Sequence, residues 1–178
     1  MPSQVSQSAD ERELVQRVRD GSSEALATLY ARYGDRLMSL AYRITGIVAD
    51  AEDVLHDVFL GLPQALTHYE ERGQLVAWLR RLTVRVALTR LRRGAREREV
   101  ALDDDSAVAA EQSIEDRVTL ETAVQMLPDS LRVVFVLKVI EGHSHAEVAS
   151  MLGITPGASE VRLVRAIKQL RALLGQPS

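Results

Sequence analysis

The sequence contains no cysteine and few aromatic residues, with two Phe, four Tyr and one Trp among 178 residues. The absence of cysteine excludes a disulfide framework, a Cys-ligated zinc site and a thiol nucleophile, and it fits a reducing compartment. The longest uninterrupted apolar run covers only residues 133–137, whereas a helix needs about 20 apolar residues to span a bilayer. Residues 1–10 are polar and lack a basic start, so we expect no signal peptide and no membrane insertion. These absences predict a cytoplasmic protein.

Recognisable catalytic and cofactor motifs are also lacking. The sequence has no phosphate-binding G-x-x-x-x-G-K-[ST] loop, no G-x-G-x-x-G pattern, no G-x-S-x-G nucleophile elbow and no H-E-x-x-H zinc motif. His143 and His145 form an H-x-H pair, and His56 and His68 stand alone, without the further ligands that a metal site would need. We therefore predict that the protein is not an enzyme and needs neither a metal nor a cofactor.

Apolar residues recur at helical spacing along most of the chain, and no segment alternates as a strand would. Pro63 is expected to kink or break the helix that begins near Asp50, because proline removes an amide donor and clashes with the preceding turn. From Gly94 to about Ser113 the periodicity fails, and acidic and small residues indicate a solvated linker.

The predicted fold is therefore all-α, with two small helical domains joined by an acidic flexible linker. The C-terminal domain is expected to be a helix-turn-helix. The predicted boundaries are a disordered tail at 1–9, a helical domain at 10–94, the linker at 95–113 and the helix-turn-helix domain at 114–174.

The helix-turn-helix prediction depends on the signals around a short turn. Ser144 and Glu147 form a capping-box pattern, Gly153 permits the turn, and Thr155 with Pro156 begins a second helix. In such a motif the second helix enters the major groove of DNA. A helical hairpin with a solvated basic face is the less favoured alternative. Three basic residues on the second helix could contact phosphates or base edges, namely Arg162, Arg165 and Lys168.

The net charge of −3 conceals alternating blocks of sign. Residues 46–71 hold six acids and no base, and residues 72–98 hold nine Arg against one acid. Residues 99–129 hold nine acids against one base, and residues 130–178 hold six bases against three acids. Such asymmetry indicates separate charged surfaces that face different partners.

Acidic residues gather at the start of one predicted helix, where Asp50, Asp53 and Asp57 share a face. The helix dipole accounts for acids in the first turn, but not for Asp57, which a partner's arginines could pair. A following amphipathic helix carries arginines on its polar face that could track a nucleic-acid backbone. These are Arg80, Arg81, Arg85, Arg90, Arg92 and Arg93.

Several segments together resemble a known family. Residues 50–60, DAEDVLHDVFL, resemble the DAEDVLQEVFL signature of bacterial extracytoplasmic-function sigma factors of the sigma-70 family. Residues 77–79 and 88–93 resemble the family's AWL…ALDRLRR segment, and residues 127–142 and 146–165 resemble its C-terminal helix-turn-helix region. The resemblance extends over about residues 10–174, in the family's order and spacing.

The resemblance implies a promoter-recognition subunit of RNA polymerase with three binding surfaces. One would dock on the clamp helices of the polymerase's largest subunit, through Asp50, Glu52, Asp53, Asp57 and Phe59. The arginine-rich helix, with Arg80, Arg81, Arg85, Arg90, Arg92 and Arg93, would capture the melted non-template strand of the −10 element. The helix-turn-helix would read the −35 duplex through Thr155, Ser159, Glu160, Arg162, Arg165 and Lys168.

The resemblance also implies partners and differences from the family. The partners would be core RNA polymerase, promoter DNA and a membrane-associated anti-sigma factor, and the free protein is expected to be a monomer. Ser159, Glu160 and Val161 replace a usual VKS. Glu160 repels phosphate but could accept a hydrogen bond from a cytosine amino group. These differences predict a departure from the consensus −35 preference.

Two other functions remain as alternatives. A stand-alone helix-turn-helix regulator would bind duplex DNA, usually as a dimer on paired half-sites. It would leave the acidic helix without a role, and no dimerisation heptad is evident. A sigma-mimic adaptor would instead sequester an anti-sigma factor, consistent with a reading helix in which Glu160 opposes phosphate contacts.

Overall fold

The computed structural model describes residues 4–70, 75–101 and 119–175. All the regular elements of these residues are helical, which confirms the all-α prediction. The chain divides into two compact units, which are described separately below.

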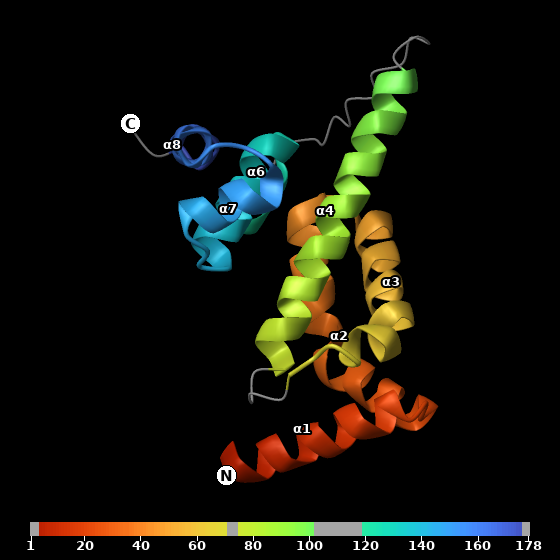
Figure 1. Ribbon diagram of the computed structural model, residues 1–178. Helices are drawn as coiled ribbons and strands as arrows, with labels where there is room; N and C mark the ends of the chain where they lie inside the picture. The colour runs from red at the N-terminus through yellow and green to blue at the C-terminus, as the bar shows by residue number, and fades with distance from the viewer. Residues whose placement is uncertain (1–3, 71–74, 102–118, 176–178) are drawn as a thin grey trace. The chain divides into compact units, whose positions relative to one another are not determined.

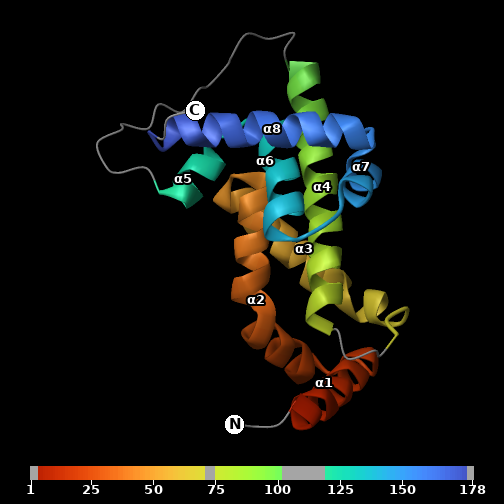
Figure 2. The ribbon, with the colours of Figure 1, turned by 90° about the vertical axis from the view of Figure 1, so that its left-hand side faces the viewer.

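The first unit comprises residues 1–42 and 47–87. In Figures 1 and 2, α2, α3 and the first part of α4 run alongside one another, and α1 crosses one end of them. Leucines that recur at helical spacing are almost completely buried between these helices, among them Leu29, Leu62 and Leu79. The helices are α1 (Gln4–Arg19), α2 (Ser23–Thr45), α3 (Val48–Leu66) and α4 (Leu75–Ala101).

The first helix begins earlier than the sequence predicts. A disordered tail is expected at 1–9, whereas α1 starts at Gln4 and residues 1–3 lie outside the described residues. Val15 and Val18 are almost completely buried, so packing of the later part of α1 holds the helix in place. The polar residues before them continue the same helix.

The predicted break at Pro63 is wrong, because α3 continues through it to Leu66. Pro63 lies in the last turn of the helix, so the amide that it lacks would have closed only one hydrogen bond near the end. Leu62 and Leu66, on either side of it, are completely buried. Their packing stabilises the last turn despite the proline.

The arginine-rich helix is longer than predicted. The acidic linker is expected at 95–113, but α4 continues to Ala101, and residues 102–113 lie outside the described residues. Residues 95–101 read AREREVA and thus consist of Ala, Arg, Glu and Val. Ala, Arg and Glu are strong helix formers, so this charged segment extends a helix although it lacks an apolar stripe.

The second unit comprises residues 43–46 and 88–178. Figure 2 shows α8 lying across α6, with α7 near the end where α8 begins. Val134, Leu137 and Ala166 are completely buried in its core. Its complete elements after α4 are α5 (Leu120–Gln125), α6 (Asp129–Phe135), the π-helical segment η1 (Val136–Ile140), α7 (His145–Leu152) and α8 (Pro156–Leu173).

The helix expected at 130–140 changes its hydrogen-bond pattern midway. It is α-helical in α6 and becomes a π-helix in η1, where the Glu141 amide donates to the Val136 carbonyl oxygen at 2.9 Å. This bond spans five residues instead of four. Val136 and Leu137 remain buried, while Val139 is 53% exposed.

Candidate functional site

The acidic residues of α3 form a stripe on the surface of the first unit. Glu52, Asp53 and Asp57 are exposed, and Asp50 is half-buried at the start of the helix. The opposite face of α3 carries the buried Val54 and other apolar residues. The helix therefore holds the carboxylates in fixed register on the solvent side, and we call these four residues the acidic stripe.

Phe59, which the resemblance assigns to polymerase docking, lies below this surface. Its side chain is only 7% exposed, and its ring centroid is 4.9 Å from that of Tyr30. Leu60, in contrast, is 72% exposed. Leu60 follows Asp53 by seven residues and Asp57 by three, so it shares their face, and this spacing is a signal that the sequence analysis did not use.

A groove runs beside the acidic stripe, between α2 and α3. Its walls carry both carboxylates and apolar side chains, so an incoming chain would meet negative charge and apolar surface together. It is lined by Tyr30, Gly34, Asp35 and Met38 of α2 and by Glu52, Asp53, Leu55 and His56 of α3.

The predicted −10 arginines do not all share one face of α4. Helical spacing places Arg81, Arg85 and Arg92 on one side of the helix, and all three are exposed. Arg93 is exposed but lies about a quarter turn or more away from them. Arg80 and Arg90 are half-buried. Three of the six arginines therefore share one face of α4, and the guanidinium of one of them, Arg92, donates to the Met151 carbonyl oxygen at 2.6 Å.

The helix-turn-helix forms with the caps that the sequence predicts. The Ser144 hydroxyl oxygen accepts from the Glu147 amide at 3.2 Å, and the Glu147 carboxylate accepts from the Ser144 amide at 2.7 Å. Hydrogen bonds from the Ser144 side chain and backbone lower the pKa of Glu147. Gly153 takes the left-handed conformation, with φ at 68°, and ends α7.

The second helix of the motif also begins as predicted. The Thr155 hydroxyl oxygen accepts from the Ala158 amide at 3.1 Å, and Pro156 lies in the first turn. Thr155 is exposed, but its hydroxyl is engaged as the cap. It therefore fixes where α8 starts.

The predicted −35 residues separate into exposed and covered groups. Glu160, Arg165 and Lys168 are exposed on one face of α8, while Arg162 is half-buried at its flank. Ser159 is completely buried, and its hydroxyl lies 2.9 Å from Nδ1 of His145. Ser159 thus supports the exposed face of α8 from beneath.

Two apolar residues on the exposed face of α8 were not among the predicted site residues. Val161 is 50% exposed and Val164 is 67% exposed. Their separation of three residues, and their position next to Glu160 and Arg165, place them among the charged residues of that face. The helical spacing of these valines beside the charged residues is visible in the sequence, and it is the signal that could have identified them.

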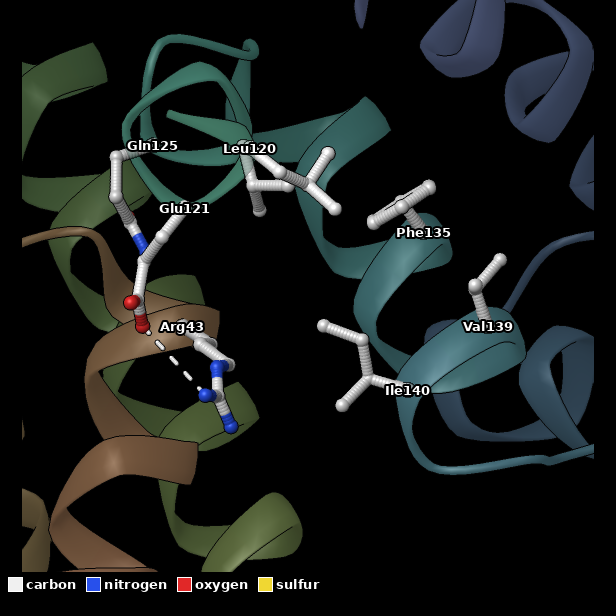
Figure 3. Close-up of a pocket in the computed structure, with 8 residues that line it drawn as sticks. Arg43, Leu120, Glu121, Gln125, Phe135, Val139 and Ile140 are labelled. Carbon is white, nitrogen blue, oxygen red and sulfur yellow. Dashed lines mark hydrogen bonds and ion pairs between the residues drawn. The ribbon is translucent and has the colours of Figure 1, made fainter. Parts of the chain in front are cut away.

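The second unit also contains a pocket with apolar walls (Figure 3). At its edge the Arg43 guanidinium lies 3.5 Å from the Glu121 carboxylate. Such a lining suits an apolar side chain better than a phosphate or a metal ion. The other lining residues are Leu120, Val124, Gln125, Phe135, Val139 and Ile140.

The part of the chain that the structure describes offers neither a metal site nor a membrane-spanning helix. Among the residues that the structure describes, no cluster of His, Cys, Asp and Glu could hold a metal ion. Within the same described ranges, no helix combines the length and the apolar character needed to cross a membrane.

Family models match both units. Sigma-70 region 2 matches residues 29–97, and Sigma-70 region 4 matches residues 117–170. The acidic stripe therefore falls in the first match and the helix-turn-helix in the second.

Curated relatives match most of the chain. It is 32% identical over 167 residues to the RNA polymerase sigma factor CarQ of Myxococcus xanthus, an alignment covering 91% of this chain and 96% of CarQ. It is 30% identical over 156 residues to the ECF RNA polymerase sigma factor SigM of Mycobacterium tuberculosis, covering 87% of this chain and 80% of SigM.

Solved structures show the same fold. The sigma factor RpoE of Bartonella quintana, in complex with the anti-sigma factor NepR, matches with a TM-score of 0.58 and 22% identity, over 84% of this chain and 96% of RpoE. CnrH, in complex with the cytosolic domain of CnrY, matches with a TM-score of 0.52 and 27% identity, over 94% of this chain and 98% of CnrH. The chain belongs to the extracytoplasmic-function sigma factors of the sigma-70 family, and it is an alternative sigma factor that directs transcription initiation.

Proposed function

We propose that this sigma factor acts in the cytoplasm, docks on core RNA polymerase through the acidic stripe of α3, and reads promoter DNA with α4 and α8. The observation that carries the proposal is the separation of charge between helices. Exposed carboxylates gather on α3, whereas exposed basic residues gather on α4 and α8. Carboxylates repel DNA phosphates and attract a basic protein surface, so the two kinds of helix suit two kinds of partner.

Docking on the polymerase would combine charge with one apolar anchor. Glu52, Asp53 and Asp57 can pair with arginines on the clamp helices, and Leu60 can insert beside them. Charged pairs steer the encounter and fix its register, while burial of an exposed leucine adds affinity. Phe59 lies beneath this surface and contacts the ring of Tyr30, which is itself 51% exposed. This contact would hold α3 in place against α2.

Promoter recognition would be divided between the two basic helices. Arg81, Arg85 and Arg92 share one face of α4 and would follow the backbone of the melted −10 strand. The exposed face of α8, including Arg165 and Lys168, would enter the major groove of the −35 duplex. The protein itself would catalyse no bond-forming or bond-breaking step, since the polymerase supplies the chemistry.

A separate anti-sigma factor is the regulatory partner that we propose. RpoE and CnrH, which resemble this chain, are each seen in complex with such a partner or with a partner's cytosolic domain. An anti-sigma factor that covers the acidic stripe or the basic helices would compete directly with polymerase or promoter. Regulation would then act through occupancy of these surfaces.

The test is transcription by core RNA polymerase supplied with the purified protein, on a library of genomic promoter fragments. The proposal expects promoter-specific transcripts that are lost with Asp53→Arg. The matched control is Glu13→Arg, which makes the same change of charge at an exposed position of α1. It should leave the transcripts in place.

The other outcomes distinguish the alternatives. Polymerase binding without transcripts would favour a sigma-mimic adaptor. Specific duplex binding without polymerase binding would favour a stand-alone regulator. Equal transcription by both charge-reversal variants would contradict docking through the acidic stripe.

A further inference from the structure

The outer face of α8 is defined by its burial pattern. Ser159, Ala166 and Leu170 are buried on the inner side, where α8 packs against α6 and α7. The residues on the outer side recur at intervals of three and four, and all are exposed. They are Gly157, Glu160, Val161, Val164, Arg165 and Lys168. We call these six residues the reading face.

Two valines lie in the middle of this charged face. Val161 and Val164 are 50% and 67% exposed, whereas Leu163 and Ile167 of the same helix are at least partly covered. The burial pattern of α8 therefore leaves these two valines with their methyl groups in solvent. Because valine is branched at Cβ, its χ1 angle is restricted in a helix, so the methyl groups stand in nearly fixed positions.

Such a surface matches the floor of the DNA major groove. Thymine is the base that presents a methyl group there, and small apolar side chains recognise it by contact. The neighbouring Glu160 can accept a hydrogen bond from the cytosine amino group. Arg165 and Lys168, further along the same face, supply the positive charge that phosphates or guanine require.

We propose that Val161 and Val164 determine −35 specificity by contacting thymine methyl groups, with Glu160 selecting a cytosine beside them. This inference rests on the proposed function, because it requires α8 to enter the −35 duplex. The basic residues on the same face favour DNA as the occupant over an apolar protein surface. Glu160 opposes phosphate, so it belongs over the base edges and not at the groove's rim.

The experiment uses uracil, which lacks only the methyl group of thymine. Holoenzyme assembled from core polymerase and the full chain transcribes a promoter identified in the preceding test, with each −35 thymine replaced in turn by uracil. Loss of one buried methyl contact should weaken promoter use about fourfold at one or two positions. Uracil elsewhere in the element should have little effect.

Variants then assign the methyl contact to a residue. Val164→Ala or Val161→Ala should reduce use of the thymine promoter and abolish the penalty of uracil at one position, because the contacting partner is already gone. Val48→Ala, which shortens a similarly exposed valine at the start of α3, should retain the full penalty. The folded state is preserved in each variant because the side chains are exposed.

Three results would overturn the inference. A promoter that depends on its −35 sequence, yet tolerates uracil at every thymine, would exclude methyl recognition while leaving the proposed function intact. Valine variants that lose activity equally on thymine and uracil promoters would assign these residues to a protein contact. Absence of any promoter-specific transcript would overturn the proposed function and this inference with it.

Discussion

Nδ1 of His145 lies 2.9 Å from the hydroxyl oxygen of Ser159, and this pair joins the first turn of α7 to the inner side of α8. Ser159 is completely buried, and His145 is half-buried. Ser159 stands in place of the valine of the VKS pattern that this segment resembles, and it forms a polar link between the two helices of the helix-turn-helix. A hydrogen bond depends on the angle between donor and acceptor, whereas apolar packing has little directional preference. The link therefore fixes the orientation of one helix on the other as well as their separation.

The His145–Ser159 pair should stabilise the second unit measurably. We expect Ser159→Ala to reduce the free energy of unfolding by about 1 kcal/mol, because a buried hydrogen bond is lost. In a double-mutant cycle with His145→Ala, the second substitution should cost less in the presence of the first. Urea unfolding measures both effects. Strictly additive losses would show that the two side chains stabilise the protein independently.

The capping box at the start of α7 should respond to acid. Hydrogen bonds from Ser144 lower the pKa of Glu147, so its contribution to stability is present above the ordinary carboxyl range and is lost as the pH falls through the lowered value. Ser144→Ala should raise the pKa of Glu147 and destabilise the protein at neutral pH. NMR titration of the Glu147 side chain tests this. Ser150→Ala, on the same helix, is the control and should leave the titration unchanged.

The ionisation of Tyr33 should report the packing of α1 against α2. Burial, followed by its hydrogen bond to Glu11 at 2.6 Å, raises the pKa of Tyr33 to about 12. The unfolded chain loses this proton near pH 10, so stability should fall as the pH rises from about 10 through about 12. Ultraviolet titration should show an ionisation near pH 12 that Tyr33→Phe removes and Tyr30→Phe retains. Persistence of that step in Tyr33→Phe would refute the assignment.

Leu60 should contribute to polymerase affinity without contributing to folding. It is 72% exposed, so Leu60→Ala should leave the free energy of unfolding nearly unchanged. Burial of this side chain at an interface should be worth roughly a tenfold change in affinity for core polymerase. A binding titration of the fluorescently labelled protein measures the change. Unaltered affinity would place the docking surface elsewhere.

Features that depend on near neighbours in the chain are those that the sequence predicts well. The capping pair Ser144 and Glu147 is three residues apart, and Thr155 caps the helix that immediately follows it. The alignment of Asp53 and Asp57 likewise follows from helical spacing alone. In each case a single helical turn brings the residues near one another.

Features that depend on tertiary packing were not predictable in the same way. The contact of His145 with Ser159 joins residues 14 positions apart across a turn. Pro63 remains helical because buried leucines on either side hold the last turn. The sequence shows that Phe59 and Leu60 are apolar, but only the packing against Tyr30 shows which of them is covered.

The π-helical hydrogen bond from Glu141 to Val136 has a consequence for comparing relatives. A π-turn accommodates one residue more than an α-turn within an otherwise continuous helix. Removal of a single residue from η1 (Val136–Ile140) would let α-helical bonding continue, with α6 and α7 still joined. An alignment guided by structure should therefore accept a one-residue gap within this helix, at a place where an alignment of sequences alone would avoid one.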